Sequence, residues 1–111
     1  MNTTTTDTDP LSSRQFSHRV GIELNRAERY RIFVSLSVLD LDPFLKQHGE
    51  LSDERRESLM KRIRERIRVC DYVSFISDNS LGLLFPETPR QGAEIATRRL
   101  VEVVKGEIAR L

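Results

Sequence analysis

The residues that could do chemistry are few, and most of them also fit a structural role. Asp40 and Asp42 end an apolar segment, directly before Pro43. Carboxylates in this arrangement can bind a divalent cation, but acids before a proline are also typical turn formers, and we interpret them as turn formers. Cys70 is the single cysteine, and Arg68 is the only cation near it, so we expect an inert thiol.

The histidines and the charge pattern argue against a metal site and against a nucleic-acid-binding surface. His18 and His48 are the two histidines, and no third ligand lies at metal-site spacing, so we expect no metal and no cofactor. The 18 basic residues are balanced by 17 acidic ones, whereas a nucleic-acid-binding protein usually has a basic excess. Residues 52–69 are rich in arginine, but acids lie among the bases and no aromatic residue interleaves. We interpret this segment as a solvated helix face and expect no nucleic-acid partner.

The composition also predicts the cellular compartment and the number of domains. No apolar run approaches the roughly 20 residues of a membrane span, so we expect no membrane partner. The single cysteine favours a reducing compartment. Residues 1–11 have neither the apolar core nor the basic residues of a secretory signal and are predicted to be a disordered leader. We therefore expect a cytoplasmic protein with one domain, residues 12–111.

Three helices are predicted to carry these residues. Ser12 or Ser13 caps the first, which extends to about Tyr30, and Thr88-Pro89 begins the last. The middle helix is capped by Ser52 and extends to about residue 69. In the first helix the predicted apolar stripe is Phe16, Val20, Leu24 and Ala27, with Glu23 on the solvated face.

Three strands alternate with the helices. Residues 32–39 are apolar on both faces, which is typical of a strand inside a layered domain. Segments 72–76 and 81–85 are joined by a short polar link, which predicts a hairpin in which Asn79 takes the left-handed conformation. The order α-β-α-β-β-α predicts an α+β fold, an α/β sandwich with a ferredoxin-like sheet.

Three stretches in this order resemble the GGDEF family, the diguanylate cyclase fold. Residues 39–44 are similar to the family's D-I/L-D-x-F segment, and residues 67–73 to its I-R-x-x-D-x-V segment. Residues 83–88 are similar to the L-L-x-P-E-T that follows the family's signature hairpin. The resemblance covers residues 16–111, and an unrelated ferredoxin-like domain is the alternative.

The resemblance implies a degenerate catalytic site. Aligning the segments places the signature at Ser77-Asp78-Asn79-Ser80-Leu81. In the family, paired glycines let the backbone cradle a triphosphate, and here Ser77 and Asp78 occupy those positions. Ser80 replaces a metal-binding acid, which leaves Asp40 as a vestigial carboxylate, and one carboxylate cannot hold two magnesium ions. His48 stands where the family has a guanine-binding asparagine. We therefore expect no enzyme activity.

One family element is retained. Arg68 and Asp71 match the RxxD motif of the family's inhibitory site, at the family spacing from the signature. The resemblance implies cyclic di-GMP as a possible ligand, since a guanidinium can bond guanine O6 and N7 and a carboxylate can accept from its N–H edge. The local alternative is a cation at a helix C-terminus beside a turn aspartate. The sequence identifies no second arginine for the site.

These features favour an inactive GGDEF-like signalling domain. It is expected to act through a protein partner or through self-association, with a cyclic di-GMP receptor as the alternative. Family domains continue with a further strand beside the first, so the fold is expected to be truncated before its last strand. The strand of residues 32–39 then lacks a neighbour, which predicts a homodimer with Val34, Leu36 and Val38 at its interface.

Overall fold

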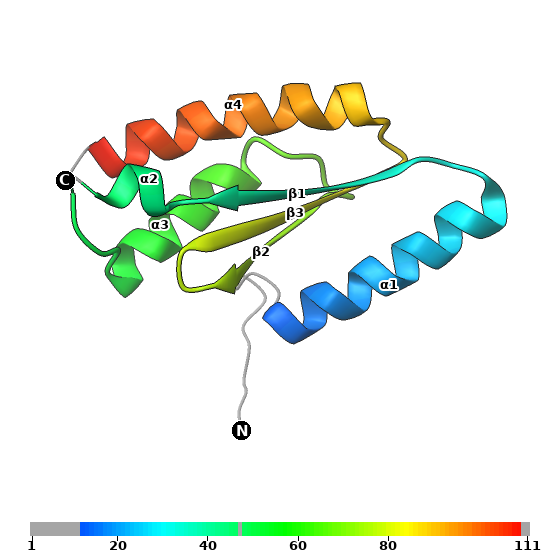
Figure 1. The fold of residues 1–111 in the computed structure, drawn as a ribbon, viewed down its shortest axis with the longest axis horizontal. Helices are drawn as coiled ribbons and strands as arrows, with labels where there is room; N and C mark the ends of the chain where they lie inside the picture. Colours follow the sequence, from blue (N-terminus) through cyan, green and yellow to red (C-terminus); the bar gives the residue numbers. More distant parts are fainter. Residues whose placement is uncertain (1–11, 47, 110–111) are drawn as a thin grey trace.

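The computed structural model describes residues 12–46 and 48–109, and the predicted leader, residues 1–11, lies outside them. The elements, in chain order, are α1 (Ser13–Tyr30), β1 (Val34–Asp40), α2 (Asp42–Leu45), α3 (Asp53–Arg64), β2 (Tyr72–Ser77), β3 (Ser80–Pro86) and α4 (Arg90–Ala109) (Figure 1). The α+β fold class and the predicted order are confirmed, with the short α2 inserted after β1. No helix in the described ranges is long and apolar enough to cross a membrane.

The sheet has three antiparallel strands in the order β1-β3-β2. β3 is central, so within the described ranges β1 has a strand neighbour on one side only. The β2–β3 hairpin is confirmed, but the expectation for Asn79 was wrong, because Asn79 is not among the described residues with positive φ. A register shift between Phe75 and Ser77 adjusts the hairpin instead.

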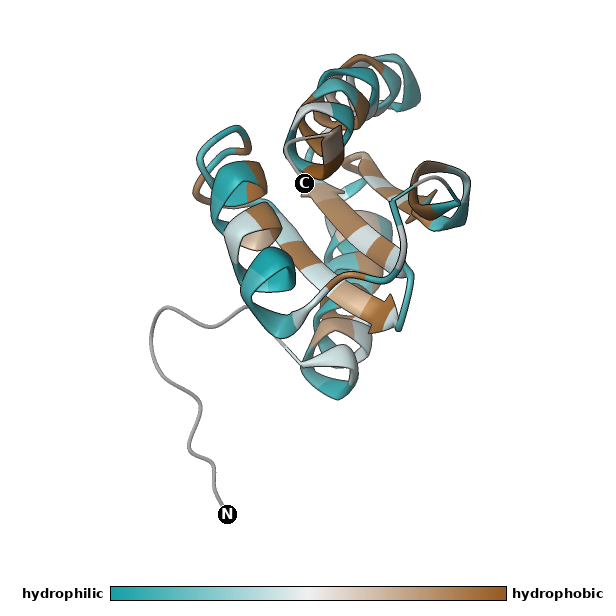
Figure 2. Ribbon diagram, turned by 90° about the vertical axis from the view of Figure 1, so that its left-hand side faces the viewer, coloured by the Kyte–Doolittle hydropathy of each residue, from teal (hydrophilic) through white to brown (hydrophobic). Residues whose placement is uncertain are grey.

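Helices cover both faces of the sheet (Figures 1 and 2). On one face, a Cβ atom added to Gly82 of β3 would lie 2.7 Å from the ring of Phe16, so α1 packs directly on the central strand. On the other face, the hydroxyl groups of Ser37 in β1 and Thr97 in α4 lie 2.8 Å apart. α3 packs on the same face as α4, with Arg56 stacked over the ring of Phe75.

The main core lies between the sheet and the α3–α4 layer. On α4, Val104 is fully buried, whereas Val103 is only partly buried. The buried residues of this core are Leu39, Leu41, Leu45, Leu51, Leu59, Met60, Ile63, Val73, Leu81, Leu83, Phe85, Ala93, Leu100, Val104 and Ile108.

The predicted buried stripe of α1 was partly wrong. Phe16 is 3% exposed, as expected, but Leu24 is 54% exposed and Glu23 is only 6% exposed. Position 23, and not position 24, therefore completes the inward stripe that begins at Phe16. Glu23 tolerates this position because Arg26 donates a hydrogen bond of 2.7 Å to its carboxylate. That hydrogen bond is the main cause of a raised pKa of Arg26.

The middle helix is shorter than predicted, because α3 ends at Arg64 and not near residue 69. The amide of Arg66 bonds the carbonyl of Ile63, which tightens the last turn. A separate turn then forms over residues 68–71, and the chain enters β2. The apolar pattern did not show this break, since Ile67 still packs against the core.

Candidate functional site

The RxxD segment forms a closed turn between α3 and β2. The amide of Asp71 donates to the carbonyl of Arg68 at 3.0 Å, and the amide of Arg68 donates to Asp71 Oδ2 at 2.9 Å. These reciprocal bonds fix the backbone at both ends of the motif. The turn places both side chains at the start of β2, beside the end of β3.

The two side chains of the motif bond each other. Arg68 Nη2 lies 2.8 Å from Asp71 Oδ1, and Arg68 Nε lies 3.2 Å from both carboxylate oxygens. The carboxylate-bearing side chain is 4% exposed, whereas that of Arg68 is 53% exposed. The hydrogen bond that the Arg68 guanidinium donates to Asp71 raises the pKa of Arg68, against the smaller effect of burial. In this structure Arg68 and Asp71 therefore bond each other within the turn, as the local alternative to a ligand site expected.

Arg68 also ties β3 to the start of α4. Its Nη2 group donates to the carbonyl of Pro86 at 2.9 Å and to the hydroxyl of Thr88. The carbonyl of Thr88 in turn accepts a hydrogen bond of 2.7 Å from Ser35 of β1. The motif thus connects the turn before β2 with both other strands. Within the described ranges, Arg68 Nη1 has no hydrogen-bond partner.

A cavity of about 270 Å³ opens beside the motif. Its lining includes Arg68 and Asp71 and two arginines that the sequence analysis missed, Arg66 and Arg99. Arg99 supplies the second arginine that the motif alone did not reveal. A helical projection could have found it, because Arg99 lies three residues from Ala96 on the inner edge of α4.

The signature position forms the tight β2–β3 turn. Ser77 pairs with Ser80 across it. The side-chain amide of Asn79 donates to Asp42 Oδ1 at 2.8 Å, and the carbonyl of Asn79 accepts from the amide of Leu41 at 2.7 Å. The turn and the acids after β1 are therefore brought together, but by contacts that the chain makes with itself.

Asp40 also makes a local contact. Its Oδ1 atom accepts a hydrogen bond of 3.0 Å from the amide of Asp42, which is a turn of the kind expected from the sequence. No group of three or more His, Cys, Asp or Glu side chains in residues 12–46 and 48–109 could hold a metal ion. Cys70 is exposed, with its sulfur 3.8 Å from Asp71 Oδ1. His18 and His48 are exposed on α1 and after α2.

The predicted interface residues lie on the outer strand. Leu36 and Val38 of β1 are 52% and 60% exposed, and Val34 is half-buried. They lie on the face that α1 covers, but α1 contacts mainly β2. Apolar side chains on β1 are therefore left open to solvent beside the free edge of the strand.

Comparison with known proteins shows which solved structures share this fold. No protein-family profile matches the sequence, and no curated protein matches it significantly. Among solved structures, the diguanylate cyclase SiaD from Pseudomonas aeruginosa, solved in complex with its activator SiaC, matches with a TM-score of 0.71 and 23% identity. The GGDEF domain of YfiN (TpbB), from the same organism, matches with a TM-score of 0.63 and 19% identity.

These matches cover most of this chain but only part of each relative. They span 83% of this chain and 37% of SiaD, and 90% of this chain and 59% of the YfiN structure. At such identities the likeness is one of architecture. The chain has the fold of a GGDEF domain.

Proposed function

We propose that this chain is a non-catalytic signalling domain of GGDEF fold that works by binding, through the outer edge of β1. The observation that carries the proposal is the open edge, since β1 pairs only with β3 within the described ranges. Leu36 and Val38 on this strand are more than half exposed. An apolar strand with unpaired N–H and C=O groups along one side readily adds another strand.

A second copy of the chain is the simplest occupant of this edge. A two-fold axis would pair β1 antiparallel with its copy and bring the exposed leucines and valines of both strands together. The strand has no lysine or proline to prevent such pairing, and its one charged residue, Asp40, lies at its end. A signalling protein is the other candidate partner. SiaD, which shares the fold, was solved with its activator SiaC.

Light scattering after size exclusion tests the proposal. We expect about twice the chain mass of 12.9 kDa, because pairing satisfies the open edge. Leu36→Lys and Val38→Lys should each return the mass to that of one chain. In a two-fold dimer either substitution places one lysine from each copy at the interface, and the two positive charges repel each other. Ile95→Lys, which changes an exposed apolar residue of α4, is the matched control and should remain dimeric. A wild-type monomer at high concentration, or dimers unaffected by both β1 substitutions, would refute self-association.

The same proposal includes the absence of catalysis. Ser77, Asp78 and Ser80 stand at the positions where the resemblance implies phosphate-binding glycines and a metal ligand, and Asp40 bonds its own turn. Incubation with GTP and magnesium or manganese should yield no cyclic di-GMP by mass spectrometry. Product formation that is lost in Asp40→Ala would show that the site is active.

A cyclic di-GMP receptor is the second candidate, and the cavity beside Arg68 favours it. Arg66 and Arg99 line this cavity and make no ion pair with any described residue, so two guanidiniums are available beside the motif. The cavity, at about 270 Å³, is smaller than the roughly 300–1,000 Å³ of enclosed ligand sites. A dinucleotide would therefore extend beyond it onto the surface.

Calorimetry with cyclic di-GMP tests this candidate. The wild type and Arg98→Ala should bind, because Arg98 does not line the cavity. Arg68→Ala and Arg99→Ala should not. At 100 times the dissociation constant, bound ligand stabilises the fold by roughly 2.7 kcal/mol, which raises the melting temperature by several degrees. An equal ligand-induced shift in Arg68→Ala would remove the receptor function.

A further inference from the structure

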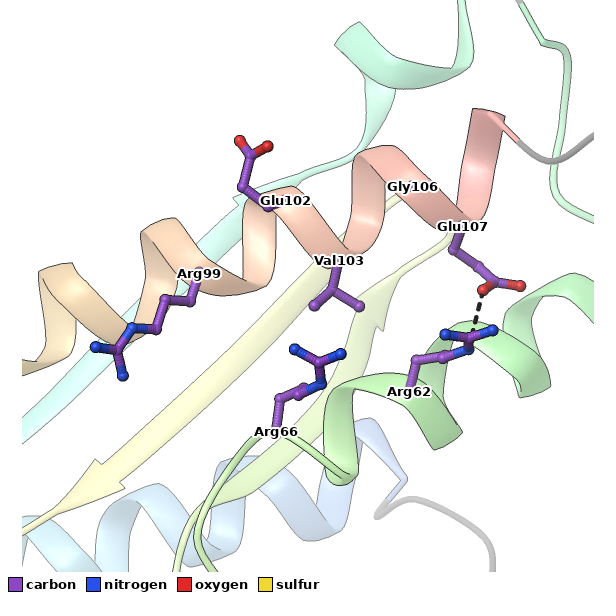
Figure 3. Close-up of a pocket in the computed structure, with 7 residues that line it drawn as sticks. All are labelled: Arg62, Arg66, Arg99, Glu102, Val103, Gly106 and Glu107. Carbon is purple, nitrogen blue, oxygen red and sulfur yellow. Dashed lines mark ion pairs between the residues drawn. The ribbon is translucent and has the colours of Figure 1, made fainter.

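A groove lies between α3 and α4, on the side of the molecule away from α1 (Figure 3). Adjoining cavities of about 270, 400 and 270 Å³ open along it, and Arg66 and Arg99 line all three. We call this feature the α3–α4 groove and define it by Arg62, Arg66, Arg99, Glu102, Val103 and Gly106. The face of α4 along the groove carries small residues, which explains why the space between the helices is not filled.

The groove carries positive charge that nothing in the described ranges balances. Each acid along its walls already has a cationic partner: Glu107 with Arg62 at 3.4 Å, Glu102 with Lys105 at 3.5 Å, and Asp71 with Arg68 at 2.8 Å. The guanidinium groups of Arg66 and Arg99, by contrast, have no ion pair and no hydrogen bond with any described residue, and both residues are exposed. Two free guanidiniums beside an apolar floor are suited to carboxylates, which they bind in a two-pronged geometry.

The length of the groove decides the form of the ligand. Together the three cavities extend along α4 from Gly92 to Gly106, which at 1.5 Å per residue is about 21 Å. An extended peptide of about six or seven residues has this length. A single anion or mononucleotide is shorter than this and would leave part of the groove empty.

We propose that the α3–α4 groove binds an extended acidic peptide segment of a partner protein. Carboxylates of the peptide pair with Arg66 and Arg99, and the chain between them lies over Val103. The inference goes beyond self-association at β1, because the groove lies on the other face of the sheet and uses none of the strand's residues.

Fluorescence polarisation tests the proposal with a labelled seven-residue peptide that has glutamate at alternate positions and blocked ends. Wild-type protein should bind it, and a peptide with glutamine in place of glutamate should bind at least about tenfold more weakly. Arg66→Ala and Arg99→Ala should each weaken binding of the acidic peptide by a similar factor. Arg64→Ala and Arg98→Ala remove the same charge from residues outside the groove and should leave binding unchanged.

Three results would overturn the inference. The first is that wild-type protein does not bind the acidic peptide at millimolar concentration. The second is that the groove variants and the control variants lose the same peptide affinity. The third is that a single-stranded oligonucleotide binds through the same arginines more tightly than the peptide does. Thermal melting of each variant shows whether it is folded. Leu36→Lys should retain peptide binding, so failure of the groove and failure of self-association are distinguishable.

Discussion

At the scale of single residues, Arg68 has a structural role whatever it binds. It satisfies the nearly buried Asp71 carboxylate and holds the carbonyl of Pro86 and the hydroxyl of Thr88. The charged pair is therefore not held ready for a ligand in this structure. A ligand must either use the remaining Nη1 group or displace part of this network.

This role predicts the cost of removing the side chain. Arg68→Ala should lower the free energy of unfolding by roughly 1–3 kcal/mol, because it leaves the buried carboxylate of Asp71 without its main donor. Chemical denaturation measures the change. Arg90→Ala removes an exposed arginine that pairs only with the exposed Glu94, and should change stability by less than about 1 kcal/mol. Equal effects of the two substitutions would contradict the structural role of Arg68.

Two glycines are predicted to respond oppositely to alanine. A Cβ atom at Gly82 would lie 2.7 Å from the ring of Phe16 and 2.9 Å from Ile76, so Gly82→Ala should destabilise the fold by roughly 1–3 kcal/mol. Gly21 lies in α1 with open space where its Cβ would be. Gly21→Ala should stabilise by roughly 0.5–1 kcal/mol. Thermal unfolding of both variants measures the two changes, and a Gly82→Ala protein as stable as the wild type would contradict the contact of α1 with β3.

At the scale of elements, the apolar pattern predicted the strands, because their apolar residues pack in the core. It failed where charge decides the packing. The buried Glu23 is held by Arg26, which is an interaction that a hydrophobic pattern cannot show. It also failed at the end of α3, where Ile67 continues the apolar pattern after the helix has stopped.

Candidate site residues could likewise be predicted only where they lie close together in the sequence. The RxxD motif was visible because its members are close in the sequence. Arg99 was not identified, because it meets Arg68 only when α4 packs beside the turn before β2. The unpaired state of Arg66 and Arg99 likewise depends on which acids the fold assigns to other partners.

The start of α3 gives a prediction for an element boundary. The hydroxyl of Ser52 accepts a hydrogen bond of 3.2 Å from the amide of Arg55, so Ser52→Ala should cost about 1 kcal/mol of stability. Ser17 lies exposed inside α1, and Ser17→Ala should be neutral or stabilising, since alanine is the better helix former. Denaturation midpoints of the two variants test the cap. A Ser52→Ala protein as stable as the wild type would contradict it.

At the scale of the whole molecule, the two faces of the domain differ in what they offer a partner. α1 packs mainly on β2 and leaves Leu36 and Val38 of β1 exposed, next to the open edge. The opposite face carries the cavity beside Arg68 and the α3–α4 groove. The proposed self-association and the proposed ligand binding would therefore use separate surfaces.

Hydrogen–deuterium exchange as a function of protein concentration tests the central claim, pairing of β1 with its copy, most directly. Amides of β3 lie inside the sheet and should exchange slowly at every concentration. The alternate amides of β1 that do not bond β3 should exchange rapidly at low concentration and become protected as the concentration rises, and Val38→Lys should abolish that gain. Exchange in β1 that stays constant across concentrations, while β3 remains protected, would contradict the account.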